Sequence, residues 1–471
     1  MDAATTGMVT LELAVAPAAV PALRRALALG RARKLALTWH DRDGALAREG
    51  IAVAAWHEGR ANFWRAEALL APPGAPPARL GEAASLAGLH RLDLPEGLAP
   101  VQHLAGHVRE GQTGPVAVRL VDGLVGAAPG TSVARLFLSG PADAVADLAE
   151  PLVPTVRVPT CSLAAEALAL AGVALPPRRL GAPVLAESLA PGDAFADAAA
   201  HLLGVLLHHA PRAQAGVTGE PVHQMRVALR RLRSLLGVFG DVVACPEVAA
   251  LRPALQTLAT ALGPARDWDV FLADTGAVIA TAFADEAELA ALLAEAAARR
   301  SAAYAALAPL LAGPALHSTA LRTAILVQAR PWGVNDAGLA DIGGFAASVL
   351  TRRLRQLAKR AANLDTAPEA ALHEMRIRAK RLRYAAEVFA PLFPGRPARR
   401  FLKRLAALQE ALGLLNDGVV AASLMHELAA AGGAGLAGGL VRGFVAAGAS
   451  GARQTIAHAW KRLRKAGPFW S

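Results

Sequence analysis

The sequence is poor in aromatic residues and in cysteine. Only 4% of its 471 residues are aromatic while 54% are apolar, so a core must come from alanine, leucine and valine, a composition that favours helices. The two cysteines, Cys161 and Cys245, lack the spacing of metal ligands and are typical of a reducing compartment. There is no run of about 18 uncharged apolar residues and no signal-peptide pattern at the N-terminus. We therefore expect a cytoplasmic protein with no membrane segment.

Acidic residues are too few to balance the basic ones, and only one part of the chain carries the imbalance. The chain has 49 Lys and Arg against 38 Asp and Glu, a net charge of +11. Residues 1–190 carry 17 of each sign, whereas residues 191–471 carry 32 basic and 21 acidic residues. This asymmetry indicates an anionic partner for the C-terminal part, although a solvated basic face would give the same composition.

The two parts also differ in hydrophobic pattern. Residues 1–185 contain short alternating segments bounded by turns, which predict an α+β domain with antiparallel strands. After a linker at 186–194, apolar residues recur with helical periodicity, which predicts an all-α domain over 195–471. In the N-terminal part, the predicted strands are 10–15, 50–56, 115–121 and 132–140, the predicted helix is 17–29, and the predicted loop is 71–82.

The helical part is a duplication with a single offset. HQMRVALRRLRSLLGVF, from residue 223, returns as HEMRIRAKRLRYAAEVF from residue 373, 150 residues later. Residues 258–269 match 408–419 at the same offset. One offset for all these positions predicts two repeats, at about 195–340 and 341–471, related by a pseudo-twofold axis in a helical bundle. The two basic helices would then be able to face each other.

Each basic helix carries a stripe of cations. In the first copy, His223, Arg226, Arg230 and Arg233 share one face, and the second copy repeats the pattern. Neighbouring cations of a stripe are about 4.5–6 Å apart along the axis, which suits an extended polyanion better than one phosphate. Repulsion at i, i+4 in both copies suggests that an anion relieves it. The residues expected to bind phosphate are His223, Arg226, Arg230, Arg231, Arg233, Arg266, Arg352, Arg355, Lys359, His373, Arg376, Lys380, Arg381, Arg383, Lys403 and Arg404.

Acidic residues near the stripes suggest an alternative to phosphate binding, in which the arginines have a structural role. The arginines would then be solvated, or paired with Glu220, Glu374, Glu387 and Asp267. Asp267 and Asp269, in GPARDWDVF, are expected to cap a helix or to hold an arginine, since too few carboxylates cluster for a metal site. We expect no metal and no cofactor.

The repeated motifs resemble a known family. The H-x-x-R-V-x-x-R-R-L-R segment from residue 223, LGPARDWDVF, and the second copy from residue 373 are similar to the CHAD domain, the conserved-histidine α-helical domain. The resemblance covers about 195–471. It implies a pseudo-symmetric helical fold that binds inorganic polyphosphate in a basic central cavity, without catalysis.

The N-terminal part resembles a degenerate CYTH domain, an antiparallel β-tunnel of triphosphate-processing enzymes. Residues 39–56 are similar to the first strands of that family. Of its E-x-E-x-K motif only Glu12 remains, with Thr10 and Ala14 at the other two positions, and Ala54 and Trp56 stand where the family has arginines. One carboxylate cannot readily hold the metals of triphosphate chemistry, and a tunnel without its cations would bind a triphosphate poorly. We therefore expect no enzymatic activity and no catalytic residue.

Three functions remain open from the sequence. The first is polyphosphate binding, with attachment to polyphosphate granules as a consequence. The second is a metal-dependent triphosphatase that uses another carboxylate set (Glu49, Glu58, Glu67), with the helical domain as its substrate-binding module. The third is a nonspecific nucleic-acid binder, but Phe239 and Tyr384 are too few aromatics for a base-stacking platform. The expected partner is inorganic polyphosphate, not a specific nucleic acid or a membrane. The oligomeric state is left open.

Overall fold

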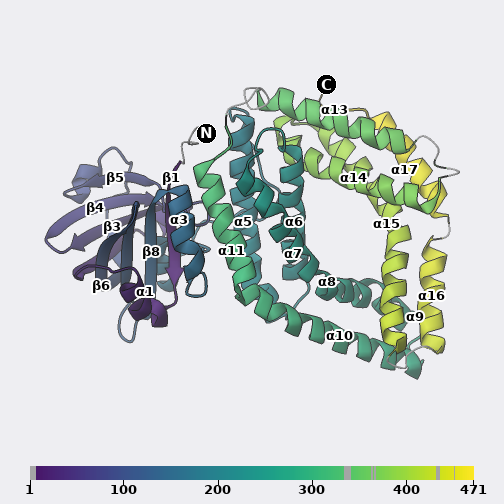
Figure 1. The fold of residues 1–471 in the computed structure, drawn as a ribbon, viewed down its shortest axis with the longest axis horizontal. Coiled ribbons are helices and arrows are strands. Elements are labelled where there is room, and N and C mark those ends of the chain that lie inside the picture. Colours follow the sequence, from purple (N-terminus) through teal and green to yellow (C-terminus); the bar gives the residue numbers. More distant parts are fainter. Residues whose placement is uncertain are drawn as a thin grey trace. The chain divides into compact units, whose positions relative to one another are not determined.

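The computed structural model describes residues 7–333, 341–361, 364, 367–430, 435–449 and 451–470. The chain divides into two units (Figure 1). Unit 1 consists of Met1–Gly181, Ala199–His208 and Gly313–Pro331, and unit 2 of Ala182–Ala198, His209–Ala312 and Trp332–Ser471. Two helical segments from the predicted 195–471 domain therefore belong to unit 1.

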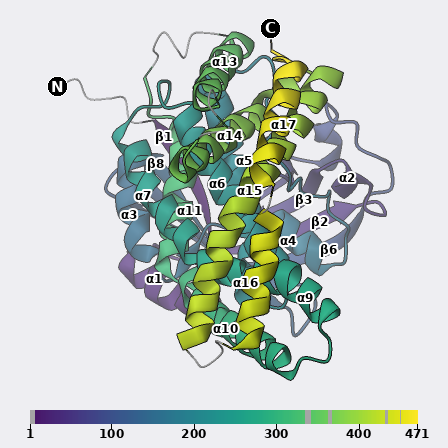
Figure 2. The ribbon, with the colours of Figure 1, turned by 90° about the vertical axis from the view of Figure 1, so that its right-hand side faces the viewer.

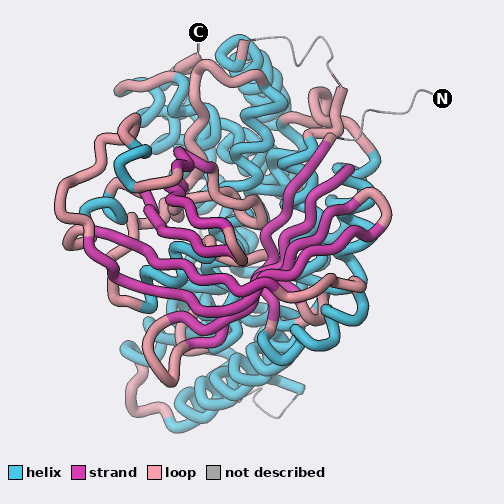
Figure 3. Tube along the Cα trace, turned by 90° about the vertical axis from the view of Figure 1, so that its left-hand side faces the viewer, coloured by secondary structure: helices cyan, strands magenta, loops and turns pink. Residues whose placement is uncertain are grey.

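Unit 1 is built on one curved sheet of nine antiparallel strands (Figure 3). The strand order is β5-β4-β3-β2-β6-β7-β8-β1-β9, so the sheet is largely a chain of hairpins. This confirms the predicted α+β domain with antiparallel strands. The strands are β1 (Met8–Val15), β2 (Arg33–Asp41), β3 (Ile51–Glu58), β4 (Ala61–Ala68), β5 (Arg79–Ala83), β6 (Ala99–Thr113), β7 (Val116–Val125), β8 (Thr131–Pro141) and β9 (Val156–Arg157).

Side-chain alternation gives the sheet its two faces. In β1, Val9, Leu11 and Leu13 are buried in a hydrophobic cluster, whereas Thr10 and Glu12 point the other way and line a cavity. The cluster is completed by side chains of four helices: α1 (Val20–Ala26), α3 (Ala142–Ala149), the middle of α5 (Pro191–Ala215), and α11 (Pro314–Ala329). One face of the sheet therefore packs against these helices, and the other carries a second hydrophobic cluster and a cavity.

Several boundaries in this region differ from the prediction. The helix expected over 17–29 is a 3₁₀ turn, Pro17–Ala19, followed by the shorter α1, which ends at Ala26. Strand β5 begins at Arg79, inside the expected loop. Helix α5 begins within the segment predicted as a linker, because Pro191 fits the first helical turn, where no backbone N–H is needed.

Unit 2 is helical, as predicted, and helices α16 and α17 each run alongside α15 (Figures 1 and 2). Within the described residues, no single helix has the length and apolar composition to span a membrane, and only α10 and α11 taken together pass that test. Besides α5 and α11, the helices named below are α6 (Glu220–Val238), α7 (Pro246–Ala261), α8 (Gly263–Val270), α10 (Ala287–Ala312), α13 (Ile342–Arg360), α14 (Glu369–Phe389), α15 (Arg396–Ala430), α16 (Leu436–Ala449) and α17 (Ala452–Ala466).

The two basic helices, α6 and α14, pack against each other. Both are amphipathic, with Met225 and Met375 fully buried at matching positions of the repeat. At their C-terminal ends, the rings of Phe239 and Phe389, also matching positions, have centroids 5.7 Å apart, and Phe345 of α13 stacks on Phe239. The repeated apolar residues thus build one shared core, and this brings the two cationic faces together.

Candidate functional site

A basic cavity lies beside the α6–α14 pair. Its volume is about 770 Å³, and helices α6, α7, α13 and α14 line it. Among the described residues that line it are seven arginines and no carboxylate. We call this site the arginine cavity, and its arginines are Arg230, Arg233, Arg252, Arg352, Arg353, Arg378 and Arg381.

Glu387, the acidic residue that links α6 to α14, does not line this cavity. Glu387 of α14 accepts hydrogen bonds from Arg231 of α6 at 3.3 Å and from Arg383 at 2.6 Å. Arg383 also donates to Gln409 of α15 at 2.9 Å. Arg231 and Arg383 therefore serve the packing of the bundle, in line with the structural alternative for those two residues.

Three of the seven cavity arginines are held by neutral groups. Arg252 donates to the carbonyl oxygen of Leu236 at 2.7 Å, and Arg353 to that of Arg381 at 2.5 Å. Arg378 donates to Gln356 at 3.2 Å. These contacts fix the guanidinium groups without neutralising them, so the positive charge of the cavity persists.

The remaining cavity arginines have weak charge compensation. Arg352 reaches the exposed Asp241 at 3.5 Å, a pair that water screens. The guanidinium of Arg230 lies over the ring of Tyr384, 4.9 Å from its centroid. Arg233 and the side chain of Arg381 make no hydrogen bond or ion pair within the described part of the chain.

Burial and mutual repulsion are visible in the pKa of Arg353. Burial, followed by the neighbouring Arg352 and Arg381, lowers that pKa to about 10. Arg353 thus remains charged at neutral pH at a position that disfavours charge. An anion in the cavity would relieve this cost.

The first predicted stripe reaches Tyr384 on α14, the helix that carries the second. Burial raises the pKa of Tyr384, Arg230 lowers it, Glu387 raises it, and Arg383 and Arg376 lower it. No described residue of the α14 stripe lines the arginine cavity, so the structure joins only the first stripe to this site.

The N-terminal half of the α6 stripe leads away from the cavity towards α8. Arg226 is half-buried and donates to the carbonyl oxygen of Ala259 at 3.3 Å, and burial lowers its pKa while Asp267 opposes that shift. Burial, and then Arg266, lower the pKa of His223, which favours the neutral imidazole. Without a bound anion, His223 is therefore mainly uncharged at neutral pH.

The structure brings only part of the predicted set into the arginine cavity. Arg230, Arg233, Arg352 and Arg381 line it. Arg404 lines a smaller pocket between α15 and α17. The others lie outside both: His223, Arg226 and Arg231 on α6, Arg266 on α8, Arg355 and Lys359 on α13, His373, Arg376, Lys380 and Arg383 on α14, and Lys403 on α15.

Sequence reasoning missed three lining residues, Arg252, Arg353 and Arg378. Arg378 and Arg381 are three residues apart on α14, so they form a second cationic face that the repeat did not reveal, because residue 228 of the first copy is alanine. Arg353 adjoins the expected Arg352. Arg252 had no signal in the sequence, since only the packing of α7 on α6 brings it near.

Asp269 holds an arginine, which is one of the two roles predicted for it. Its carboxylate accepts hydrogen bonds from Arg300 of α10 at 2.7 Å and from the hydroxyl of Tyr304 at 2.8 Å. This contact joins α8 to α10.

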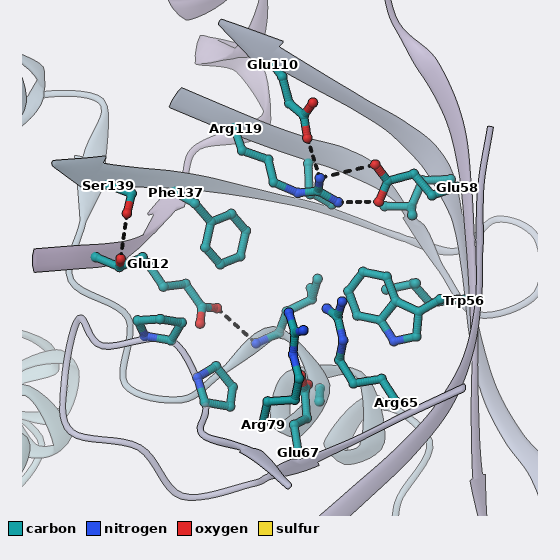
Figure 4. Close-up of a pocket in the computed structure, with 18 of the residues that line it drawn as sticks. Glu12, Trp56, Glu58, Arg65, Glu67, Arg79, Glu110, Arg119, Phe137 and Ser139 are labelled. Atoms are coloured by element: carbon teal, nitrogen blue, oxygen red, sulfur yellow. Dashed lines mark hydrogen bonds and ion pairs between the residues drawn. The ribbon is translucent and has the colours of Figure 1, made fainter. Parts of the chain in front are cut away.

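Unit 1 has a second cavity, enclosed by the curved sheet (Figure 4). Its volume is about 680 Å³, and residues from β1 to β8, with Leu163 and Ala164, line it. We call it the β cavity. Its charged residues are Glu12, Glu58, Arg65, Glu67, Arg79, Glu110 and Arg119.

The β cavity differs from the expected tunnel without cations, because three arginines line it. They come from β4, β5 and β7, outside the two strands that carry the family motifs, and carboxylates pair with each. Arg119, for example, donates to Glu58 and Glu110 at 2.5 Å. Trp56, at a family arginine position, does line the cavity.

Glu12 is engaged in the fold. It is 1% exposed, and it accepts hydrogen bonds from Arg135 and from the backbone N–H of Leu163, each at 3.1 Å. Burial raises its pKa against the effect of Arg135. Of the alternative carboxylates, Glu58 and Glu67 line the cavity, but Glu49 does not. Within the described ranges, no three His, Cys, Asp or Glu side chains are arranged as a metal site.

Comparison with known proteins identifies the helical region. The model of the CHAD domain matches residues 197–426. The CHAD-domain crystal structure from the plant Ricinus communis is 34% identical, with a TM-score of 0.51, and the match covers 62% of this chain and 96% of that chain. PptA from Streptomyces chartreusis is 20% identical, with a TM-score of 0.46 over 58% of this chain and 99% of its own. No curated protein matched. With this identity over nearly the whole of the Ricinus domain, the chain belongs to the CHAD-domain family.

Proposed function

We propose that unit 2 binds inorganic polyphosphate in the arginine cavity. The observation that carries this proposal is a cavity to which the described part of the chain contributes seven arginines and no carboxylate. Guanidinium groups bind phosphate oxygens through two parallel hydrogen bonds, and a chain of phosphates presents such oxygens at every unit. Polyphosphate would replace the repulsion among Arg352, Arg353 and Arg381 with attraction.

The lining residues favour polyphosphate over single-stranded nucleic acid. Binding of single strands relies on aromatic rings on which bases stack. Tyr384 is the one aromatic residue among those described as lining the arginine cavity, and Arg230 covers its ring. Polyphosphate needs no stacking surface and carries a denser charge.

In this proposal the protein is a binder and not an enzyme. The β cavity has arginines, but Glu58, Glu82 and Glu110 neutralise them, and Glu12 is paired with Arg135. A triphosphate entering it would meet four carboxylates. A cytoplasmic protein that binds long polyphosphate would be carried to polyphosphate granules.

The test compares long-chain polyphosphate with single-stranded DNA, titrated against the full chain at increasing salt. The full chain is needed because α5 and α11 contribute Leu203, Leu207 and Leu321 to the core of unit 1. The proposal requires that polyphosphate binding survive near-physiological salt while DNA binding is lost. Equal loss of both ligands would mean a generic basic surface. Metal-dependent release of phosphate from inorganic triphosphate would instead support the triphosphatase.

A further inference from the structure

The β cavity combines an apolar wall with carboxylates. Trp39, Trp56 and Phe137 line it together with leucine and valine side chains. Figure 4 shows Trp56 and Phe137 beside the charged groups, with Glu67 and Arg79 on one side and Glu58 and Arg119 on another. Its volume of about 680 Å³ lies in the range of small-molecule sites, which are mostly apolar with a few placed polar groups.

The charges of the cavity are paired except at one residue. Arg65 donates to Glu82 at 2.9 and 2.7 Å, Arg79 lies 3.3 Å from the same carboxylate, and Arg119 is held by Glu58 and Glu110. Glu12 is paired with Arg135. Within the part of the chain that the structure describes, Glu67 lines the cavity without a hydrogen bond or an ion pair.

The surroundings of Glu67 disfavour its charge. Burial and then Glu12 raise its pKa to about 7, although Arg65 and Arg79 act in the opposite direction. A carboxyl group in this state gains most from a partner that brings a positive charge. An anion at the same place would be repelled by the carboxylates of Glu67 and Glu12.

The aromatic wall already accepts a cation on its face. The guanidinium carbon of Arg65 lies 4.2 Å from the ring centroid of Trp56. Such contacts are favourable when the cation is partly desolvated. Trp39 and Phe137 supply further aromatic surface in the same cavity.

We propose that the β cavity binds a small organic cation, an ammonium group on an apolar body, with the ammonium at Glu67 and the body against Phe137 and the leucine and valine side chains of the wall. This ligand class is opposite in charge to the triphosphate that the family resemblance of unit 1 implies. The inference concerns unit 1 alone and does not depend on polyphosphate binding.

The ligand test uses the full chain and calorimetric titration at pH 8. The probes are phenethylammonium and hexylammonium, with 2-phenylethanol as the neutral analogue and 3-phenylpropanoate as the anionic one. The ammonium probes should bind about tenfold or more tighter than the alcohol, the factor that corresponds to one unit of pKa at Glu67. The carboxylate should bind most weakly. Failure of both ammonium probes, or equal binding of all charges, overturns the proposal.

A pH series and two variants test whether Glu67 supplies the negative charge that binds the ammonium group. Ammonium affinity should fall as pH decreases from 8 to 5.5, because the Glu67 carboxylate, which faces Glu12, Arg65 and Arg79, takes up a proton. Glu67→Gln should remove both the preference for the cation and this pH dependence. Glu49→Gln, at an exposed position outside the cavity, should leave both unchanged. Retention of both in E67Q, or displacement of the ammonium probe by inorganic triphosphate, would contradict the assignment.

Discussion

The salt dependence of polyphosphate binding offers a quantitative test of the arginine cavity. For single-stranded polyanions, each neutralised phosphate contributes about −0.7 to the slope of log affinity against log salt. Seven arginines line the cavity, so the parent should have a slope of about −5 if all of them engage phosphate. Between about 50 and 200 mM salt its affinity should then fall about a thousandfold.

The double variant Arg233→Ala/Arg381→Ala should reduce that slope to about −3.5, and the loss over the same salt range to about a hundredfold. Neither side chain makes an ion pair within the described residues, and alanine preserves both helices, so the variant should unfold at the parent's temperature. Fluorescence anisotropy with labelled long-chain polyphosphate measures the slope.

The matched control is Arg24→Ala/Arg25→Ala. These arginines are exposed on α1 in unit 1, and their loss changes the net charge of the protein by the same amount. The control should keep the parent slope. If both double variants lower the slope equally, or if R233A/R381A keeps it, the cavity is not the binding site and the reasoning fails.

Three further predictions concern stability. The raised pKa of Glu67 means that the folded state binds a proton more tightly than the unfolded state, so the free energy of unfolding should fall as pH rises from about 4.5 to 7. Urea titrations of E67Q should lack up to roughly 3 kcal/mol of this fall. An unchanged pH profile in E67Q would contradict the assignment. Phe389→Ala should cost about 3–5 kcal/mol in unfolding free energy, because the ring is fully buried, whereas Phe444→Ala at a 44% exposed position should be nearly neutral; similar costs would rule out the shared core. Asp269→Ala should lower the free energy of unfolding by about 3 kcal/mol, because it removes the carboxylate that pairs with Arg300 and accepts the hydrogen bond of the Tyr304 hydroxyl. A change smaller than the measurement error would refute this role of Asp269.

Local pattern predicted part of the secondary structure of both units, but it did not predict β5, which begins in a segment predicted as a loop. Alternation predicted strands at β1, β3, β7 and β8, and the helical period predicted α6 and α14, because each element buries one face. The boundaries at Ala26 and Pro191 were less well predicted, since local turns decide them and hydrophobic period does not.

The candidate sites were only partly predictable. The repeat located three of the seven cavity arginines, Arg230, Arg233 and Arg381, because residues on one helix share a face by geometry alone, and the basic cluster after residue 351 added Arg352. Arg252 could not be found in this way, since α7 reaches α6 only through packing. Arg226 belongs to the predicted stripe, but it lies outside the arginine cavity and donates to the carbonyl oxygen of Ala259.

The sequence by itself determined the fold class, the duplication and the excess of positive charge in the C-terminal part, since these depend on composition and on spacing along the chain. Only the tertiary structure decided which charges remain uncompensated. Arg231 and Arg233 are two residues apart, yet Glu387 neutralises the first and the second faces the arginine cavity. In unit 1, Glu12 and Glu67 share a cavity, but only Glu12 has an arginine partner. Charge pairing depends on distances of a few ångströms between separate elements, and the linear sequence does not specify those distances.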